Sequence, residues 1–207
     1  MTTPTAALAN LEDEKEAAII EAARKTFLTR GFEAASMDAI ALRAGVSKRT
    51  VYNRFRSKEA LFAAAINKTC QRILPVNVEA IEASLPPEQF IREMASLFVH
   101  GVLDPEALAL KRIAMFEATR KPALGKAYLA HGPRFMAEAC APMLTRLAAR
   151  GALKVDDPMT AIYQLGALIT EPLYTEVLMG DPPADLDAAI AAQIDMGVKA
   201  FMKLYGA

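Results

Sequence analysis

Six basic side chains lie between Asp38 and Glu59 with no acidic side chain among them, and the six are Arg43, Lys48, Arg49, Arg54, Arg56 and Lys58. Guanidinium and ammonium groups bind phosphate oxygens, and a guanidinium can donate to O6 and N7 of guanine at once. The six residues flank Gly45, which separates two short helical patterns. Clustered positive charge on two short helices joined by a tight turn is typical of a helix-turn-helix that binds DNA. The segment therefore predicts binding to double-stranded DNA.

We expect seven side chains of this region to contact DNA: Ser36, Lys48, Arg49, Thr50, Tyr52, Asn53 and Lys58. A short helix fits the major groove with its N-terminal residues toward the base edges, so Lys48 and Arg49 are expected to read bases. Asn53 suits adenine, although it lies deeper along the helix. Arg54 and Arg56 suit phosphate by their charge, or they face solvent.

The other members of the set suit the DNA backbone. Thr50 and Tyr52 carry hydroxyl groups that bond phosphate. Ser36 and Lys58 stand at helix starts, where free N–H groups and the helix dipole favour an anion. A simpler interpretation stays open for each: an ordinary solvated helix face, a helix cap at Ser36, or a packing residue at Tyr52.

The elements that must hold these side chains are short helices with clear starts. Ser36, Ser47 and Ser57 are capping residues at close intervals, which predicts three helix starts. A helical pattern precedes them over residues 12–30, and Gly31 follows as a helix-ending residue. Later helices are expected at about 88–102, 104–119, 133–150, 158–179 and 185–204, many opened by Asp-Pro or Pro-Pro. Because no runs alternate Val, Ile and Thr with polar residues, the pattern predicts an all-α protein.

We expect an N-terminal three-helix helix-turn-helix domain followed by a C-terminal helical domain for ligand binding and dimerisation. The predicted bounds are 1–11 for a flexible tail, 12–72 for the DNA-binding domain and 73–207 for the second domain. Residues 1–72 hold twelve basic and eight acidic side chains, and the remainder holds twelve and sixteen. This asymmetry indicates that the two parts meet different partners.

The run from Glu16 to Phe62 resembles the N-terminal domain of TetR/AcrR-type bacterial transcriptional regulators. The matching positions are Arg30-Gly31-Phe32, Ser36-Met37, Ile40-Ala41, Ala44-Gly45-Val46-Ser47, Lys48, Thr50, Tyr52, Phe55, Ser57-Lys58-Glu59 and Leu61. The resemblance implies a sequence-specific regulator, and we favour a repressor that a small-molecule ligand releases from its operator. Arg49 departs from the pattern, which often has a small residue or glycine there, and this departure leaves open which base is read.

One short helix makes too few base contacts for useful specificity, so we expect a homodimer on a near-palindromic operator. The last two predicted helices carry more apolar surface than one face of a monomer normally buries. The predicted dimer interface therefore comprises Tyr163, Leu168, Tyr174, Ile194, Val198 and Phe201. The alternative is that these residues form the core.

The middle helices are rich in Met and Phe, which adapt to varied apolar shapes. We expect them to line a pocket for a small apolar or amphipathic ligand, formed by Phe98, His100, Arg112, Met115, Phe116, Phe135 and Met136. Here too the alternative is plain core.

The two cysteines, Cys70 and Cys140, match no metal-ligand spacing, and no cofactor is expected. A second hypothesis is a redox-responsive regulator acting through Cys70, which has Lys68 and Arg72 nearby. An enzyme is disfavoured because the sequence contains no Ser/His/Asp arrangement, glycine-rich phosphate loop or metal cluster. The N-terminus does not read as a signal peptide, and no apolar run approaches the roughly 20 residues that cross a bilayer, so we expect a cytoplasmic protein with no membrane partner.

Overall fold

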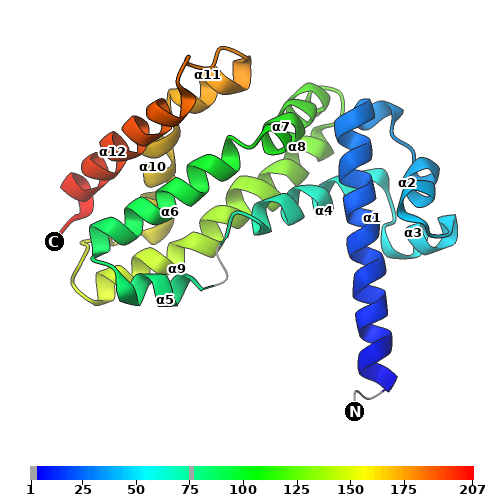
Figure 1. Cartoon of the computed structure of the whole chain (residues 1–207), viewed down its shortest axis with the longest axis horizontal. Coiled ribbons are helices and arrows are strands. Elements are labelled where there is room, and N and C mark those ends of the chain that lie inside the picture. Colours follow the sequence, from blue (N-terminus) through cyan, green and yellow to red (C-terminus); the bar gives the residue numbers. More distant parts are fainter. Residues whose placement is uncertain (1–3, 75–76) are drawn as a thin grey trace. The chain divides into compact units, whose positions relative to one another are not determined.

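The computed structural model describes the backbone of residues 4–74 and 77–207 and the side chains of residues 12–74 and 77–207. Its helices are α1 (Pro4–Ala34), α2 (Met37–Ala44), α3 (Lys48–Arg54), α4 (Lys58–Gln71), α5 (Val78–Ser84), α6 (Pro87–Val102), α7 (Pro105–Ala118), α8 (Pro122–Leu129), the π-helix η1 (Ala130–Arg134), α9 (Phe135–Ala149), α10 (Pro158–Thr170), α11 (Leu173–Met179) and α12 (Leu186–Tyr205). Within these ranges no β-strand forms (Figure 1), and an isolated bridge joins Leu153 to Gly206. The predicted all-α fold is confirmed. None of the described helices is long and apolar enough to cross a membrane.

Several helix bounds differ from the expected ones. Helix α1 begins at Pro4 and so runs through most of the segment predicted as a flexible tail, of which residues 1–3 lie outside the described part. The expected helix 158–179 is two helices, α10 and α11, because Pro172 has no N–H to continue the ladder. The expected start at 133 lies inside η1, which continues α8 into α9 and contains Pro133. Helix α5 has no counterpart in the prediction.

The chain divides into two compact units that are not contiguous in sequence. The first unit comprises Met1–Thr69 and Ala109–Gly132, and the second unit comprises Cys70–Leu108 and Pro133–Ala207. The first unit therefore contains the helix-turn-helix together with most of α7 and all of α8. The prediction had placed residues 109–132 in the second domain.

Three aromatic rings form the centre of the first unit. The Phe27 ring centroid lies 5.7 Å from that of Phe32 and 5.3 Å from that of Phe62, and the rings of Phe32 and Phe62 are 5.6 Å apart. All three side chains are buried, as are Ile40 and Val51 from the helix-turn-helix. Gly31 has a φ of 73°, a left-handed conformation that favours glycine and ends the regular part of α1 as predicted.

The second unit is built around the packing of α12 against α10 and α6, with α9 on α10. Gln193 of α12 is buried, and its Nε2 donates to the backbone oxygens of Leu168 (2.8 Å) and Glu171 (2.7 Å). These carbonyls lie at the end of α10, where the helix provides no partner. Gly197 lies beside them, because a Cβ there would come within 2.5 Å of the Leu168 oxygen. Close approach of α12 to α10 therefore needs glycine at this position.

We expect Gly197→Ala to lower the free energy of unfolding by about 1–3 kcal/mol, because the added methyl group meets backbone that cannot move aside. Gly166→Ala in α10 is the matched control, since a Cβ at Gly166 has nothing within 4 Å. The control should be neutral or stabilise by up to about 1 kcal/mol through its helix propensity. Urea unfolding followed by circular dichroism measures both, and equal effects would contradict the close approach.

Candidate nucleic-acid interface

The turn between α2 and α3 is built from local hydrogen bonds. The Ser36 Oγ accepts from the N–H of Ala39 at 3.1 Å, which caps α2. Gly45 then takes a left-handed φ of 68°, and the Val46 N–H donates to the Ala41 oxygen at 3.1 Å. The Ser47 Oγ accepts from the N–H of Thr50 at 3.1 Å and so caps α3. The predicted serine caps of α2 and α3 are confirmed.

Helix α3 turns one side to the core and the other to solvent. Val51 and Phe55 are buried and fix its rotation. The side chains of Lys48, Arg49, Tyr52 and Asn53 are exposed, and Thr50 is half-buried with its hydroxyl 2.8 Å from that of Ser47. Tyr52 is thus not a buried packing residue. Five predicted DNA-binding residues lie on this one short helix, and four of them are open to solvent.

Two basic side chains of α3 already have acidic partners. The Lys48 amine bonds the carboxylate of Asp38 at the start of α2, and both side chains are well exposed. An exposed pair of this kind is weak, so it leaves the amine able to exchange for a base or phosphate. Arg54 at the end of α3 is paired with Glu16 and Glu12 of α1.

Lys58 has different neighbours from those predicted. Its Nζ donates to the backbone oxygens of Glu33 (3.0 Å) and Ala35 (2.9 Å) and lies 4.5 Å from the centre of the Phe32 ring. Burial lowers the pKa of this amine below its usual range. The Lys58 amine therefore provides hydrogen bonds to two backbone carbonyls at the end of α1. To contact a phosphate, it would have to give up both of these hydrogen bonds.

A second cation approaches the same ring from a distant part of the chain. The Lys121 Nζ lies 5.2 Å from the Phe32 centroid and bonds the Glu33 carboxylate at 2.5 Å, which lowers the pKa of that carboxyl. Glu117 of α7 is buried, and its Oε2 has no hydrogen-bond partner among the described residues. Its negative charge favours the protonated amines of Lys58 and Lys121. Sequence reasoning missed this cluster because Glu33 and Lys121 are 88 positions apart.

The pocket prediction needs correction for the side chains on α7. Met115 and Phe116 are 54% and 62% exposed, so they do not line an enclosed cavity in this chain. The reason is helix phase, since α7 buries Leu110, Ala114 and Glu117 on its other side.

The remaining pocket residues are not gathered in one unit. His100 and Arg112 are exposed, Phe98 and Phe135 are half-buried, and Met136 is buried. Arg112 belongs to the first unit and the others to the second. The predicted pocket therefore stays a prediction.

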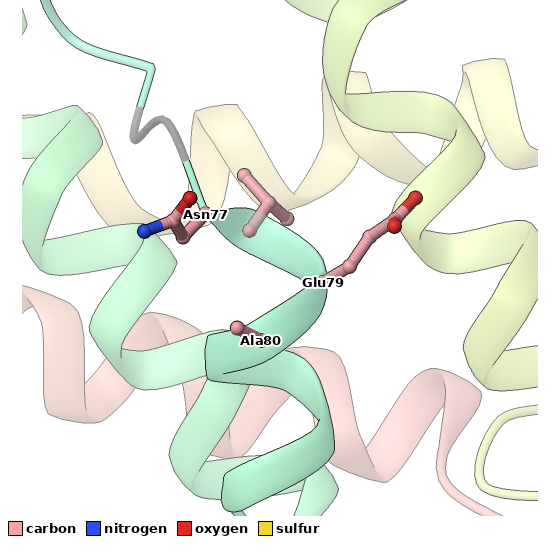
Figure 2. Close-up of a pocket in the computed structure, with 4 residues that line it drawn as sticks. Asn77, Glu79 and Ala80 are labelled. Atoms are coloured by element: carbon pink, nitrogen blue, oxygen red, sulfur yellow. The ribbon is translucent and has the colours of Figure 1, made fainter.

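A hollow of about 380 Å³ lies elsewhere in the second unit, beside the start of α5. Figure 2 shows its lining, which consists of Asn77, Val78, Glu79 and Ala80. Three of these four residues are exposed, and none belongs to the predicted pocket. The described part of its lining does not provide the apolar enclosure that small-molecule sites have.

The dimer prediction also needs correction. Ile194, Val198 and Phe201 are buried in the second unit, so they form its core and cannot meet a partner chain. An i, i+4 apolar stripe marks a buried face, but it does not tell which neighbour buries that face. Leu168 and Tyr174 are half-buried. Tyr163 alone of the predicted six is exposed.

Neither cysteine is suited to redox sensing. Burial raises the pKa of Cys70 to about 11 and that of Cys140 above its usual range. A raised pKa keeps the thiol protonated, and the thiolate is the form that reacts with oxidants. The redox hypothesis receives no support.

The capped α2–turn–α3 unit with its exposed basic side defines a helix-turn-helix DNA-binding protein. Residues 19–65 match the family model described as "Bacterial regulatory proteins, tetR family". Residues 89–207, more than half of the chain, match "AefR-like transcriptional repressor, C-terminal domain". The chain therefore belongs to the TetR family and is a DNA-binding transcriptional regulator.

Solved structures resemble the chain over most of its length. The Flavonoid-responsive Regulator FrrA is 36% identical, with a TM-score of 0.73 and coverage of 93% of this chain and 97% of that chain. A TetR-family regulator of Mesorhizobium loti MAFF303099 is 28% identical, with a TM-score of 0.78 and coverage of 95% and 98%.

Curated relatives match over varying lengths. The transcriptional activator FasR of Mycolicibacterium smegmatis is 34% identical over 86 residues, and the match covers 42% of this chain but only 39% of FasR. The regulator AlkX of Mycobacterium tuberculosis is 24% identical over 196 residues, which cover 91% of this chain and 85% of AlkX. FasR is an activator, whereas the family model that matches residues 89–207 is that of a repressor, so likeness alone does not decide the sign of regulation.

We expect Lys58→Met to lower the free energy of unfolding of the DNA-free protein by about 1–2 kcal/mol, because it removes two bonds to carbonyls and the contact with Phe32. Lys68→Met, an exposed lysine on the same helix, is the control and should stay within about 0.5 kcal/mol. Thermal and urea unfolding measure both variants. If the variant keeps its stability but binds DNA more weakly, Lys58 instead contacts a phosphate, as the sequence predicts.

Proposed function

We propose that this chain is a repressor that binds a near-palindromic operator as a homodimer and is released by a small apolar or amphipathic ligand. It acts in the cytoplasm, where bacterial DNA lies. The observation that carries the DNA-binding part is the exposed basic side of α3, held in a fixed rotation by Val51 and Phe55. The match to an AefR-like repressor domain supports repression rather than activation.

The ligand is proposed from chemistry and likeness together. FrrA is described as flavonoid-responsive and is 36% identical across nearly the whole of both chains. A flavonoid is a flat, largely apolar molecule with hydroxyl groups at its edge, which agrees with an amphipathic ligand. Flavonoids are therefore the first compounds to add to the complex of protein and operator.

The proposed mechanism depends on the spacing between the helix-turn-helix domains of the two protomers. Helix α4 runs along the chain from the first unit into the second, since the division falls between Thr69 and Cys70. DNA requires half-site centres separated by about a whole number of turns. A ligand weakens operator binding if it binds more tightly to a state with another spacing than to the state that fits DNA. The loss of operator affinity is limited by the difference between these two ligand affinities.

In the proposed dimer, six to eight phosphates are neutralised, so the logarithm of DNA affinity should fall with the logarithm of salt concentration at a slope near −6. Fluorescence anisotropy with DNA from upstream of the protein's own gene, at about 50–200 mM salt, measures this slope. A slope near zero would refute the DNA-binding interface proposed here.

Arg49→Ala should weaken operator binding by about 1–3 kcal/mol and relax discrimination at one base position, because Arg49 is proposed to read a base. Arg43→Ala removes the same charge from the exposed side of α2 and should weaken binding to all sequences alike. Competition by single-base operator variants distinguishes the two effects. Equal loss on every sequence for Arg49→Ala would contradict base reading.

The proposed dimer contact uses the exposed apolar side chains of α10 and α12, which are Tyr163, Met196 and Leu204. We expect Met196→Glu to convert the dimer into a monomer, because an unpaired charge would be buried at the interface. Leu97→Glu on α6, also an exposed large apolar residue, should leave the dimer intact. Sedimentation velocity measures both, and a dimeric Met196→Glu protein would place the interface elsewhere.

A further inference from the structure

The guanidinium of Arg54, in the basic segment, is held by acidic side chains of α1. Its Nη1 donates to the Glu16 carboxylate at 2.8 Å, and its Nη2 lies 3.7 Å from the Glu12 carboxylate. Glu12 and Glu16 are one turn apart on α1, so both face the same group. The Arg54 side chain is only 20% exposed, whereas Arg49 on the same helix is open to solvent.

The pairing is not required to position α3. Burial of Val51 and Phe55 fixes the rotation of the helix, and Ser47 caps its start. The two carboxylates lie at the surface, with Glu16 47% and Glu12 73% exposed. Because solvent reaches both carboxylates, the pair is only partly buried, and a DNA phosphate can replace them as the partner of Arg54.

The acids belong to a local concentration of negative charge. Residues 12–16 read Glu-Asp-Glu-Lys-Glu, and two of the four carboxylates in this run, those of Glu12 and Glu16, reach Arg54 at the end of α3. A DNA phosphate presents the same chemistry to a guanidinium as a carboxylate does, because both accept two parallel N–H bonds. Glu12 and Glu16 therefore compete with the DNA backbone for one group.

We propose that Glu12 and Glu16 are an internal competitor that holds Arg54 in the free protein, and that Arg54 exchanges them for a backbone phosphate when α3 enters the major groove. The exchange lowers affinity for every DNA sequence alike. Because operator DNA also gains base contacts, it stays bound at protein concentrations at which the weakened complexes with other DNA dissociate, so the competitor limits non-specific binding. The proposal rests on α3 being the DNA-reading helix.

Glu12→Gln/Glu16→Gln should bind a short mixed-sequence duplex and the upstream DNA roughly threefold to tenfold more tightly than the natural protein, since one ion pair per protomer no longer has to break. Asp13→Asn/Glu14→Gln is the matched control, because it removes the same charge from exposed neighbours. The control variant reduces only the general repulsion between acidic side chains and DNA, so its gain in DNA affinity should be smaller. Anisotropy titrations at fixed salt measure all variants, and thermal unfolding checks that each one folds.

A double-mutant cycle isolates the exchange. In an Arg54→Gln background, the extra gain of Glu12→Gln/Glu16→Gln over its control should disappear. Equal gains for the two pairs, a gain that persists without Arg54, or weaker binding would each overturn the proposal. If the double variant does not fold, Glu16→Gln alone gives the test, because Glu16 accepts the hydrogen bond from Arg54 at 2.8 Å.

The DNA-binding interface and the internal competitor are separate proposals, and different results would refute each of them. No salt-dependent DNA binding by the natural protein, or no effect of Arg49→Ala, would refute the interface itself. Normal binding and a normal Arg49→Ala effect, with no gain specific to Glu12 and Glu16, would refute the competitor alone.

Discussion

Gly31 turns the backbone with a φ of 73°, and the turn brings Phe32 against Phe27 and Phe62. Only glycine takes this conformation without steric cost. The three rings join the end of α1 to α4, and the carbonyls that follow Phe32 receive the amine of Lys58. The DNA-reading helix is positioned on this packed centre, because α2 packs on α1 and α3 packs on α2. Loss of the turn would therefore reach α3 through α2.

Basic side chains of the DNA-binding region are also less available to DNA than the composition indicates. Asp38 pairs with Lys48, and Glu12 and Glu16 pair with Arg54, so part of the positive charge is already paired within the free chain. The Lys48 pair is well exposed and therefore weak, and in the proposal above Arg54 exchanges its carboxylates for a phosphate. The structure thus combines a fixed backbone with exchangeable ion pairs. In the proposal, the exchange lowers the affinity for every DNA sequence by the same factor, so it weakens the charge-driven non-specific complexes without changing the ratio of specific to non-specific affinity.

The helix-turn-helix could be predicted in detail because its determinants are local. The bonds of Ser36 and Ser47 each reach three residues along the chain, and the left-handed turn at Gly45 needs only its own residue type. Predictions that depended on distant partners were less accurate. Ile194 was assigned to an interface and is core, while Phe116 was assigned to a pocket and is exposed. Apolar periodicity locates one side of a helix but does not identify what covers it.

The sequence by itself determined the all-α class, the family and the position of the DNA-reading helix, because capping residues, glycine turns and charge clusters act over a few residues. Only the tertiary structure decided which charges are engaged and how the chain divides. Residues 109–132 belong to the first unit, and Lys121 meets Glu33 across 88 positions. No local pattern encodes such a contact, since it exists only after the intervening helices have packed.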